Sequence, residues 1–288
     1  MRRRSFKSRI FGIVALVGVA VGRAVAQDAV IPAQTPIDAP IDLSKYKITQ
    51  VYSNDFSRAQ SIVYERDLLD KGGKRIKRPD ADVEWVVEGN GGVDVHDGVM
   101  WASPVSFDKQ GRQIAGAKRS HLVIWNNRIF PADVLIEWEM SPNSSSSGLT
   151  IVFFCATSRS GGDIFDLSLP PRGADYKNYH SGEIANYSDA YWSRNTEVES
   201  ATNRLRKNPG FALVAESQSL TTGSTAVTHH LRLLKVGGHI EVEVNGKILW
   251  KWDDRGTPLG VGRIGFRSMD GVSLITYDNL KVFKVTTK

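Results

Sequence analysis

The chain has 288 residues, of which 41 % are hydrophobic, so it is long enough for one large domain or two small ones around a sizeable core. Its 37 Lys and Arg residues against 31 Asp and Glu residues give a formal net charge of +6. Six of those basic residues lie within the first 26 positions, so the rest of the chain is balanced, which argues against a nucleic-acid partner.

Residues 1–26 have the pattern of an export signal peptide. A basic start is followed by a short apolar run at residues 10–22 and by Ala24-Val25-Ala26, an A-x-A cleavage site. We therefore expect the mature chain to begin at Gln27 and to be exported to the periplasm or the extracellular space. The apolar run is too short to span a bilayer, so we expect no membrane contact beyond export. An uncleaved N-terminal anchor is the alternative.

Residues 27–44 are rich in Pro and Ala and predict a linker or extended arm with little packing. A single domain is expected at residues 45–288, built from short strands separated by turns. Asp97-Gly98 and Asn245-Gly246 each join two apolar runs, which is the pattern of a β-hairpin. Residues 133–140 alternate, with Val134, Ile136, Trp138 and Met140 on one face and Leu135, Glu137 and Glu139 on the other.

The whole pattern predicts an all-β fold. At least ten strands and almost no long amphipathic helix favour a jelly-roll sandwich of two antiparallel sheets. Residues 179–216 lack a clear strand or helix period, and they crowd aromatic residues, a histidine, glutamates such as Glu183, and four basic residues together. Long irregular segments in compact domains are often functional, so we expect this one to be a loop region over the concave face.

Several motifs resemble those of known families. Near the C-terminus, Asn245-Gly246, Gly265-Phe266-Arg267 and Tyr277-Asp278-Asn279 follow one another in an order similar to that of concanavalin A-like lectin and glucanase jelly rolls. Across residues 45–285 the chain resembles the YesU-like family of bacterial proteins. The motifs that carry this resemblance are Ile151-Val152-Phe153-Phe154, residues 163–170, Tyr179-His180-Ser181-Gly182-Glu183-Ile184, Arg194-Asn195, residues 203–211 and Gly265-Phe266-Arg267. The resemblance implies a concanavalin A-like fold and a place among polysaccharide-degrading systems.

A secreted carbohydrate-active protein could cleave an extracellular polysaccharide by hydrolysis. Glycoside hydrolysis uses two carboxyl groups, about 5–5.5 Å apart when configuration is retained and wider apart when it is inverted. Glu183 is the first candidate, because His180 and nearby arginines could set its pKa. The candidates for the second carboxyl group, or for contacts to the substrate, are Asp163, Asp166, Glu137 and Glu139.

Cleavage by β-elimination is the other expected reaction. It needs a base, an acid and a positive group that neutralises the carboxylate of a uronic acid. His180 is the candidate base, Tyr191 or Tyr179 the candidate acid, and Arg194 and Arg206 the candidate cations. The residue types alone leave hydrolysis and elimination open.

A glycan-binding module without turnover is the alternative function, and a structural surface protein without a ligand is a third. Sugars stack on aromatic rings and hydrogen-bond to planar polar groups. The expected substrate-binding residues of this kind are Tyr179, Asn186, Asn195 and Asn203. The expected partner is thus a poly- or oligosaccharide.

We expect no cofactor. Cys155 is the only cysteine, which excludes an internal disulfide, and no zinc ligand set is present. A structural calcium ion is conceivable between Asp55 and Asp278, should the two ends of the domain pair. Residues 260–265 match a Gly-x-Gly-x-x-Gly pattern but lead into a strand, so they do not indicate a nucleotide site.

Overall fold

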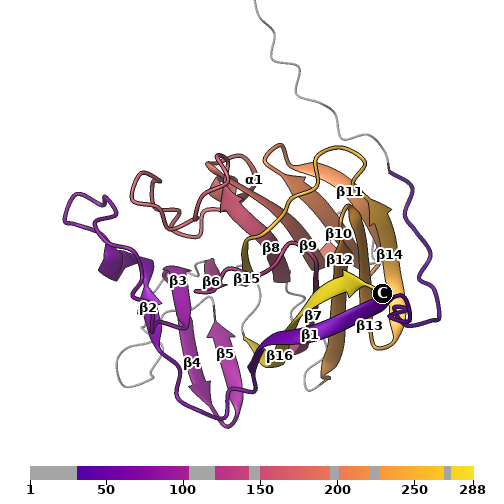
Figure 1. The fold of residues 1–288 in the computed structure, drawn as a ribbon. Helices are drawn as coiled ribbons and strands as arrows, with labels where there is room; N and C mark the ends of the chain where they lie inside the picture. Colours follow the sequence, from indigo (N-terminus) through magenta and orange to yellow (C-terminus); the bar gives the residue numbers. More distant parts are fainter. Residues whose placement is uncertain (1–30, 104–120, 143–149, 195–200, 221–226, 269–273) are drawn as a thin grey trace, which may run out of the picture.

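A computed structural model describes residues 31–103, 121–142, 150–194, 201–220, 227–268 and 274–288. These residues form two packed eight-stranded sheets, called sheet A and sheet B below (Figure 1). The sheets are antiparallel except where β2 pairs with β3. The predicted all-β jelly-roll sandwich is confirmed.

Each sheet is made from strands that lie far apart in the sequence. Sheet A has the order β11 (Ala212–Gln218), β10 (Ala201–Asn208), β9 (Ile184–Arg194), β8 (Thr150–Ser158), β15 (Arg263–Ser268), β6 (Leu122–Asn126), β3 (Trp85–Gly89) and β2 (Ile62–Tyr64). Sheet B has the order β14 (Lys247–Asp253), β13 (His239–Val244), β12 (His229–Val236), β7 (Val134–Pro142), β16 (Ile275–Thr287), β5 (Val99–Ser103) and β4 (Gly92–His96). The remaining strand, β1 (Tyr46–Asn54), pairs with β16 and so joins the two ends of the domain.

The main core lies between the sheets and follows the two-residue period of the strands. On β7, Ile136, Trp138 and Met140 are buried in this core, while Glu137 and Glu139 lie on the outer face of sheet B. The predicted alternation of this strand is confirmed. Apolar burial of this extent is the main driving force for folding.

A second apolar cluster lies on the outer face of sheet A. Residues 159–183 run across that face and contain α1 (Lys177–His180), and η1 (Glu65–Leu68) adds Leu68 to the same cluster. Tyr179 packs against Trp125 and Phe153 of the sheet, with ring centroids 6.3 and 5.4 Å away. Part of this outer face is therefore covered by the chain itself.

The long functional loop predicted at residues 179–216 is wrong in its position. Most of that stretch forms β9, β10 and the start of β11, and the irregular segment is instead residues 159–183. On β9, Tyr187 and Tyr191 face the core between the sheets, while Asn186 and Ser188 are buried on the opposite face. Because both faces of the strand are covered and polar residues occur on both, the usual apolar and polar alternation is missing from the sequence.

The N-terminal arm packs more closely than its composition predicted. Ile37 N–H donates to the carbonyl of Ile248 at 2.8 Å, and Ile41 N–H donates to Oε2 of Glu243 at 2.7 Å. The Ile41 side chain is buried with Leu135 and Leu234 on the outer face of sheet B. No helix among the described residues is long and apolar enough to cross a membrane, and the predicted signal peptide lies outside those residues.

Candidate functional site

Five side chains gather where α1 and the turn between β10 and β11 meet the outer face of sheet A. They are Tyr176, His180, Arg206, Phe211 and Arg267, and are called the His180 cluster below. The ring of His180 lies 4.9 Å from that of Tyr176 and 4.4 Å from that of Phe211, between centroids. Its Nδ1 is 2.6 Å from the hydroxyl oxygen of Ser181. The ring is thus held in one orientation.

Arg206 lies on β10, opposite Ser188 of β9, whose side chain is on the outer face of sheet A. Its guanidinium is 3.7 Å from the centroid of the Phe211 ring, and Nη1 donates to the Phe211 carbonyl at 2.7 Å. The cation–π contact and the hydrogen bond together hold the positively charged guanidinium of Arg206 beside His180.

Arg267 comes from β15, on the same face, and is fully buried. Its guanidinium lies 4.9 Å from the ring centroid of Tyr176 and 5.5 Å from that of Tyr179. Nη1 donates to the carbonyl of Ala174 at 2.9 Å. Nε and Nη2 are buried and have no hydrogen-bond partner among the residues that the structure describes.

The charges of the cluster determine which forms of its titratable groups are present. Partial burial, and next the charge of Arg206, lower the pKa of His180, so the imidazole is neutral at pH 7. Burial raises the pKa of the Tyr176 hydroxyl, although Arg206 and Arg267 oppose that shift. The cluster therefore combines a neutral imidazole, a protonated phenol and two cations, which is a set of groups suited to proton transfer beside an anion.

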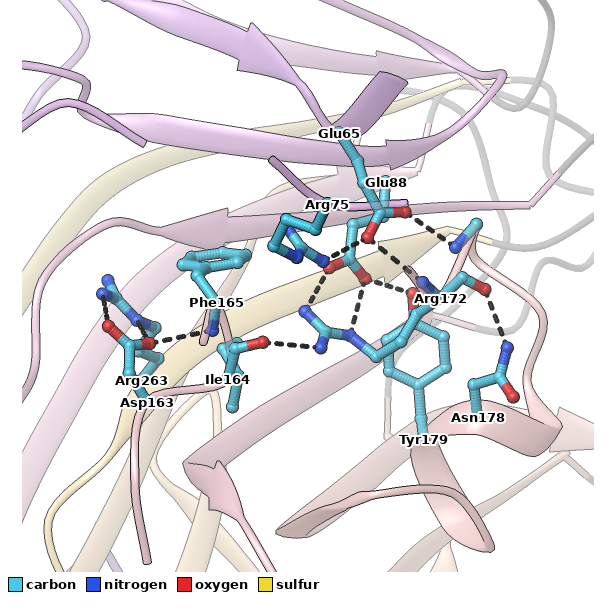
Figure 2. A network of polar contacts seen from close by, with 11 residues as sticks. Glu65, Arg75, Glu88, Asp163, Ile164, Phe165, Arg172, Asn178, Tyr179 and Arg263 are labelled. Carbon is cyan, nitrogen blue, oxygen red and sulfur yellow. Dashed lines mark hydrogen bonds and ion pairs between the residues drawn. The ribbon is translucent and has the colours of Figure 1, made fainter. Parts of the chain in front are cut away.

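Tyr179, predicted to bind substrate, is instead part of a buried network that holds residues 159–183 on sheet A (Figure 2). Its hydroxyl donates to Glu88, which also pairs with Arg172. Glu65 accepts hydrogen bonds from Arg75 at 2.6 Å and from the backbone N–H of Arg172 at 3.1 Å. Buried charges of this kind are tolerated only when they are paired, and here the pairs tie the cover to the sheet.

The other residues predicted to be catalytic do not join His180 and Arg206. Glu183 is exposed at the end of the covering segment, where its backbone carbonyl accepts from Arg159 N–H at 2.9 Å. Tyr191 is buried between the sheets, edge-on to Trp138, and thus on the opposite side of sheet A from His180. Arg194 ends β9, its side chain lies outside what the structure describes, and Asn195 is outside the described residues.

Two of the predicted sugar-binding amides are structural. Asn186 is fully buried and donates to the carbonyl of Tyr179 at 2.8 Å, and it accepts from Asn208 at 2.9 Å. Asn203 is fully buried between the sheets, where it donates to Asp189 at 3.3 Å and accepts from Trp250. Neither side chain is placed to contact a ligand on the surface.

The four candidates for a second carboxyl group all have cationic or histidine partners away from Glu183. Asp163 accepts from Arg263 at 2.9 and 2.7 Å, and Asp166 pairs with Arg78. Glu137 lies 3.1 Å from Arg232, and Glu139 lies 3.1 Å from His230. Since Glu137 and Glu139 are on the outer face of sheet B, they are on the far side of the sandwich from Glu183.

Tyr176, Phe211 and Arg267 were missed as site residues. Tyr176 lies four residues before His180, a spacing that puts two side chains together on one helical turn. In β15, Arg263, Gly265 and Arg267 alternate along one strand, which could have placed both arginines on one face. Phe211 gives no such signal, because its contact depends on the turn between β10 and β11.

The predicted approach of Asp55 to Asp278 follows from the pairing of β1 with β16, where Asn54 lies opposite Leu280. Burial raises the pKa of Asp278, and the negative charges of Glu139 and Asp55 add to the effect. Among the described residues, no group of three or more His, Cys, Asp or Glu side chains is placed to hold a metal ion. A calcium ion therefore stays a prediction.

The fold is a jelly-roll sandwich of the galectin-like kind. The model of a family described as "Domain of unknown function (DUF1961)" matches residues 74–282. The chain is also 31 % identical over 210 residues to the "Uncharacterized protein YesU" of Bacillus subtilis (strain 168), covering 70 % of this chain and 90 % of that protein. The chain belongs to the DUF1961 family, and the predicted membership in a YesU-like family is confirmed.

Solved structures agree on the fold. A crystal structure of a Bacillus subtilis protein of unknown function with a galectin-like fold is 27 % identical, with a TM-score of 0.67 over 84 % of this chain and 100 % of that chain. The exoplasmic/lumenal domain of VIP36, in a form with Ca²⁺ and Man3GlcNAc bound, is 11 % identical, with a TM-score of 0.50 over 73 % of this chain and 88 % of that chain. The second likeness is one of fold alone.

Proposed function

We propose that this is an exported protein that binds an extracellular, uronate-containing polysaccharide on the outer face of sheet A and cleaves it by β-elimination. The observation that carries the proposal is the His180 cluster, in which a neutral imidazole and a phenol adjoin two cations. The sugar-bound form of VIP36, a protein of the same fold, is consistent with a glycan ligand.

The groups of the cluster match the parts of an elimination. His180 accepts the proton from the ring carbon next to the sugar carboxylate through Nε2, in the tautomer whose Nδ1–H donates to the hydroxyl of Ser181. The electron pair of that C–H bond forms the new carbon–carbon double bond, and the bond to the glycosidic oxygen breaks. The departing oxygen takes a proton from Tyr176, and the charge of Arg206 offsets the negative charge that builds up on the sugar.

Hydrolysis fits the structure less well. The two-carboxylate mechanism needs a pair of carboxyl groups that face each other across the bond to be cleaved. The carboxylates considered as partners of Glu183 are occupied by Arg263, Arg78, Arg232 and His230. The site thus lacks the pair proposed from sequence, whereas the groups for elimination are already together.

The test is incubation of the purified mature protein with uronate-containing and neutral polysaccharides, following the ultraviolet absorbance of unsaturated products and the release of reducing ends. We expect unsaturated products from a uronate polysaccharide, and a decrease in kcat of about 10²–10⁴-fold in His180→Ala. His230→Ala is the matched control, because His230 is exposed on the outer face of sheet B. Because the pKa of His180 is lowered, the acid limb of the pH–rate profile should lie below the usual histidine value.

Full activity of His180→Ala would contradict the proposed site. A glycan-binding module without turnover is the second candidate, favoured by the aromatic surface that Tyr176 and Phe211 present around His180. Saturable binding of a polysaccharide, with neither unsaturated products nor new reducing ends, would decide for this second function.

A further inference from the structure

Arg267 differs from the other fully or nearly buried arginines of the outer face of sheet A. Arg172 is paired with Glu88, Arg263 with Asp163 and Arg75 with Glu65. Arg267 has one hydrogen bond, to a backbone carbonyl, and no ion pair among the described residues. Burying a cation without an anionic partner is costly, so such a residue is expected where an anion binds.

The geometry of the unpartnered atoms narrows the kind of anion. Nε and Nη2, the two nitrogens without a partner, form one edge of the guanidinium. That edge presents two parallel N–H donors, which match the two oxygens of a carboxylate. The flat rings of Tyr176 and Tyr179 lie close to the guanidinium. The two-donor edge and the adjoining rings together favour a planar carboxylate over a tetrahedral sulfate.

Tyr176 connects Arg267 with the reactive groups and with the surface. Its ring contacts both the guanidinium of Arg267 and the ring of His180. Tyr179 is locked to Glu88, whereas Tyr176 is only partly buried. A ligand that binds Arg267 would therefore have to pass the Tyr176 side chain, and an anion held there would lie next to His180.

We propose that the Nε and Nη2 edge of Arg267 binds the carboxylate of the uronate residue that the protein cleaves. This inference rests on the proposed function and adds to it the group that selects an acidic sugar. Arg267, on β15, then holds the sugar carboxylate. Arg206, on β10, offsets the negative charge that builds up on the sugar during the reaction.

The ligand side of the test uses matched sugars. Polygalacturonate, alginate and glucuronan are each compared with their carboxyl-reduced, neutral forms, and with a sulfated neutral glycan, by calorimetry on the full mature chain. We expect binding of at least one uronate polymer to be about tenfold or more tighter than that of its reduced form, since hydrogen bonds to charged groups have effects of this size. At equal concentration, the preferred uronate should raise the melting temperature more than its reduced form does.

The protein side uses Arg267→Lys, which keeps the charge but loses the two-donor edge. We expect this variant to lose the preference for the uronate form while it still binds the reduced form. Arg232→Lys is the control, because Arg232 is a half-buried arginine of sheet B with ion pairs to Glu137 and Glu243. If Arg267→Lys does not fold, a crystal structure of the wild type with the preferred oligouronate takes its place, with the carboxylate expected at Nε and Nη2 of Arg267.

The outcomes separate the two proposals. Equal affinity for uronate and reduced forms, preference for the sulfated glycan, an unchanged preference in Arg267→Lys, or a carboxylate seen elsewhere would each overturn the role of Arg267. Cleavage of neutral glycans that is lost in His180→Ala would overturn the role of Arg267 in binding a carboxylate. The protein would then still be a glycan-cleaving enzyme. Absence of binding to every polysaccharide would overturn the proposed function and this inference together.

Discussion

Tyr176 and Tyr179 lie three residues apart on one helical turn, and their surroundings give them different roles. Tyr179 is fully buried and its hydroxyl donates to Glu88, so it holds the covering segment on sheet A. Tyr176 is partly exposed and contacts both His180 and Arg267. A tyrosine therefore has a structural role at position 179 and belongs to the proposed site at position 176. The difference arises because Tyr179 is fully buried and Tyr176 is partly exposed.

Asp189 gives a prediction at the residue scale. It is fully buried between the sheets, its Oδ1 has no partner among the described residues, and burial raises its pKa to about 7. The folded state then holds the proton more tightly than the unfolded state, so the free energy of unfolding should fall as the pH rises from about 4 to about 7. Asp189→Asn is neutral throughout and should remove that fall, which is roughly 4 kcal/mol at most.

The measurement is urea unfolding of both proteins at several pH values between 4 and 8. Asp94→Asn is the control, since the Asp94 side chain is 77 % exposed. Parallel curves of stability against pH for the wild type and Asp189→Asn would contradict the prediction.

At the scale of elements, β9 and β10 show how a covered sheet face changes the sequence of its strands. Asn186 of β9 and Asn208 of β10 are buried on the outer face of sheet A and hydrogen-bond to each other. Polar residues are stable in such a place because their hydrogen bonds are made. Their presence explains why this stretch resembles a loop in the sequence although it forms strands.

The N-terminal arm gives a prediction at the same scale. Ile41 is 4 % exposed and packs with Leu135, Leu234 and Ile248 on the outer face of sheet B. Ile41→Ala should lower the free energy of unfolding by about 2–4 kcal/mol, because it leaves a cavity in that cluster. Ile37→Ala, at a side chain that is 47 % exposed, should change it by less than about 1 kcal/mol. Urea unfolding measures both, and equal effects would show that the arm is not packed.

At the scale of the whole molecule, each outer face of the sandwich is partly covered by a different segment. Residues 159–183 lie on sheet A, and the N-terminal arm lies on sheet B (Figure 1). The two faces also differ in charge arrangement, since the arginine and glutamate side chains of β7, β12 and β13 pair with one another on sheet B. Arg267, a buried cation without an ion pair among the described residues, is on sheet A, which is why we propose the glycan site there.

Export is a prediction about the whole chain. Expressed in a bacterium with its full sequence, the protein should accumulate outside the cytoplasm with Gln27 as its first residue, as the A-x-A site predicts. Mass spectrometry of the N-terminal peptide and cell fractionation measure this. A chain that keeps residues 1–26 and stays with the inner membrane would support the uncleaved anchor instead.

The sequence by itself determined the fold class, the alternation of β7 and the two residues His180 and Arg206 of the proposed site. Strand period, turn residues and the crowding of unlike side chains around a histidine are local properties, and local properties can be read along the chain. The sequence also provided the family, through motifs distributed over its length.

Only the tertiary structure decided which side of a strand each polar residue occupies and what lies over it. Tyr191 and Asn203 have the residue types of a sugar site but face the core between the sheets. Arg267 lies more than 80 positions from His180 in the chain, and strand pairing together with the covering segment places both beside Tyr176. The strand register and the position of the covering segment depend on contacts between distant parts of the chain. No local sequence pattern can therefore predict them.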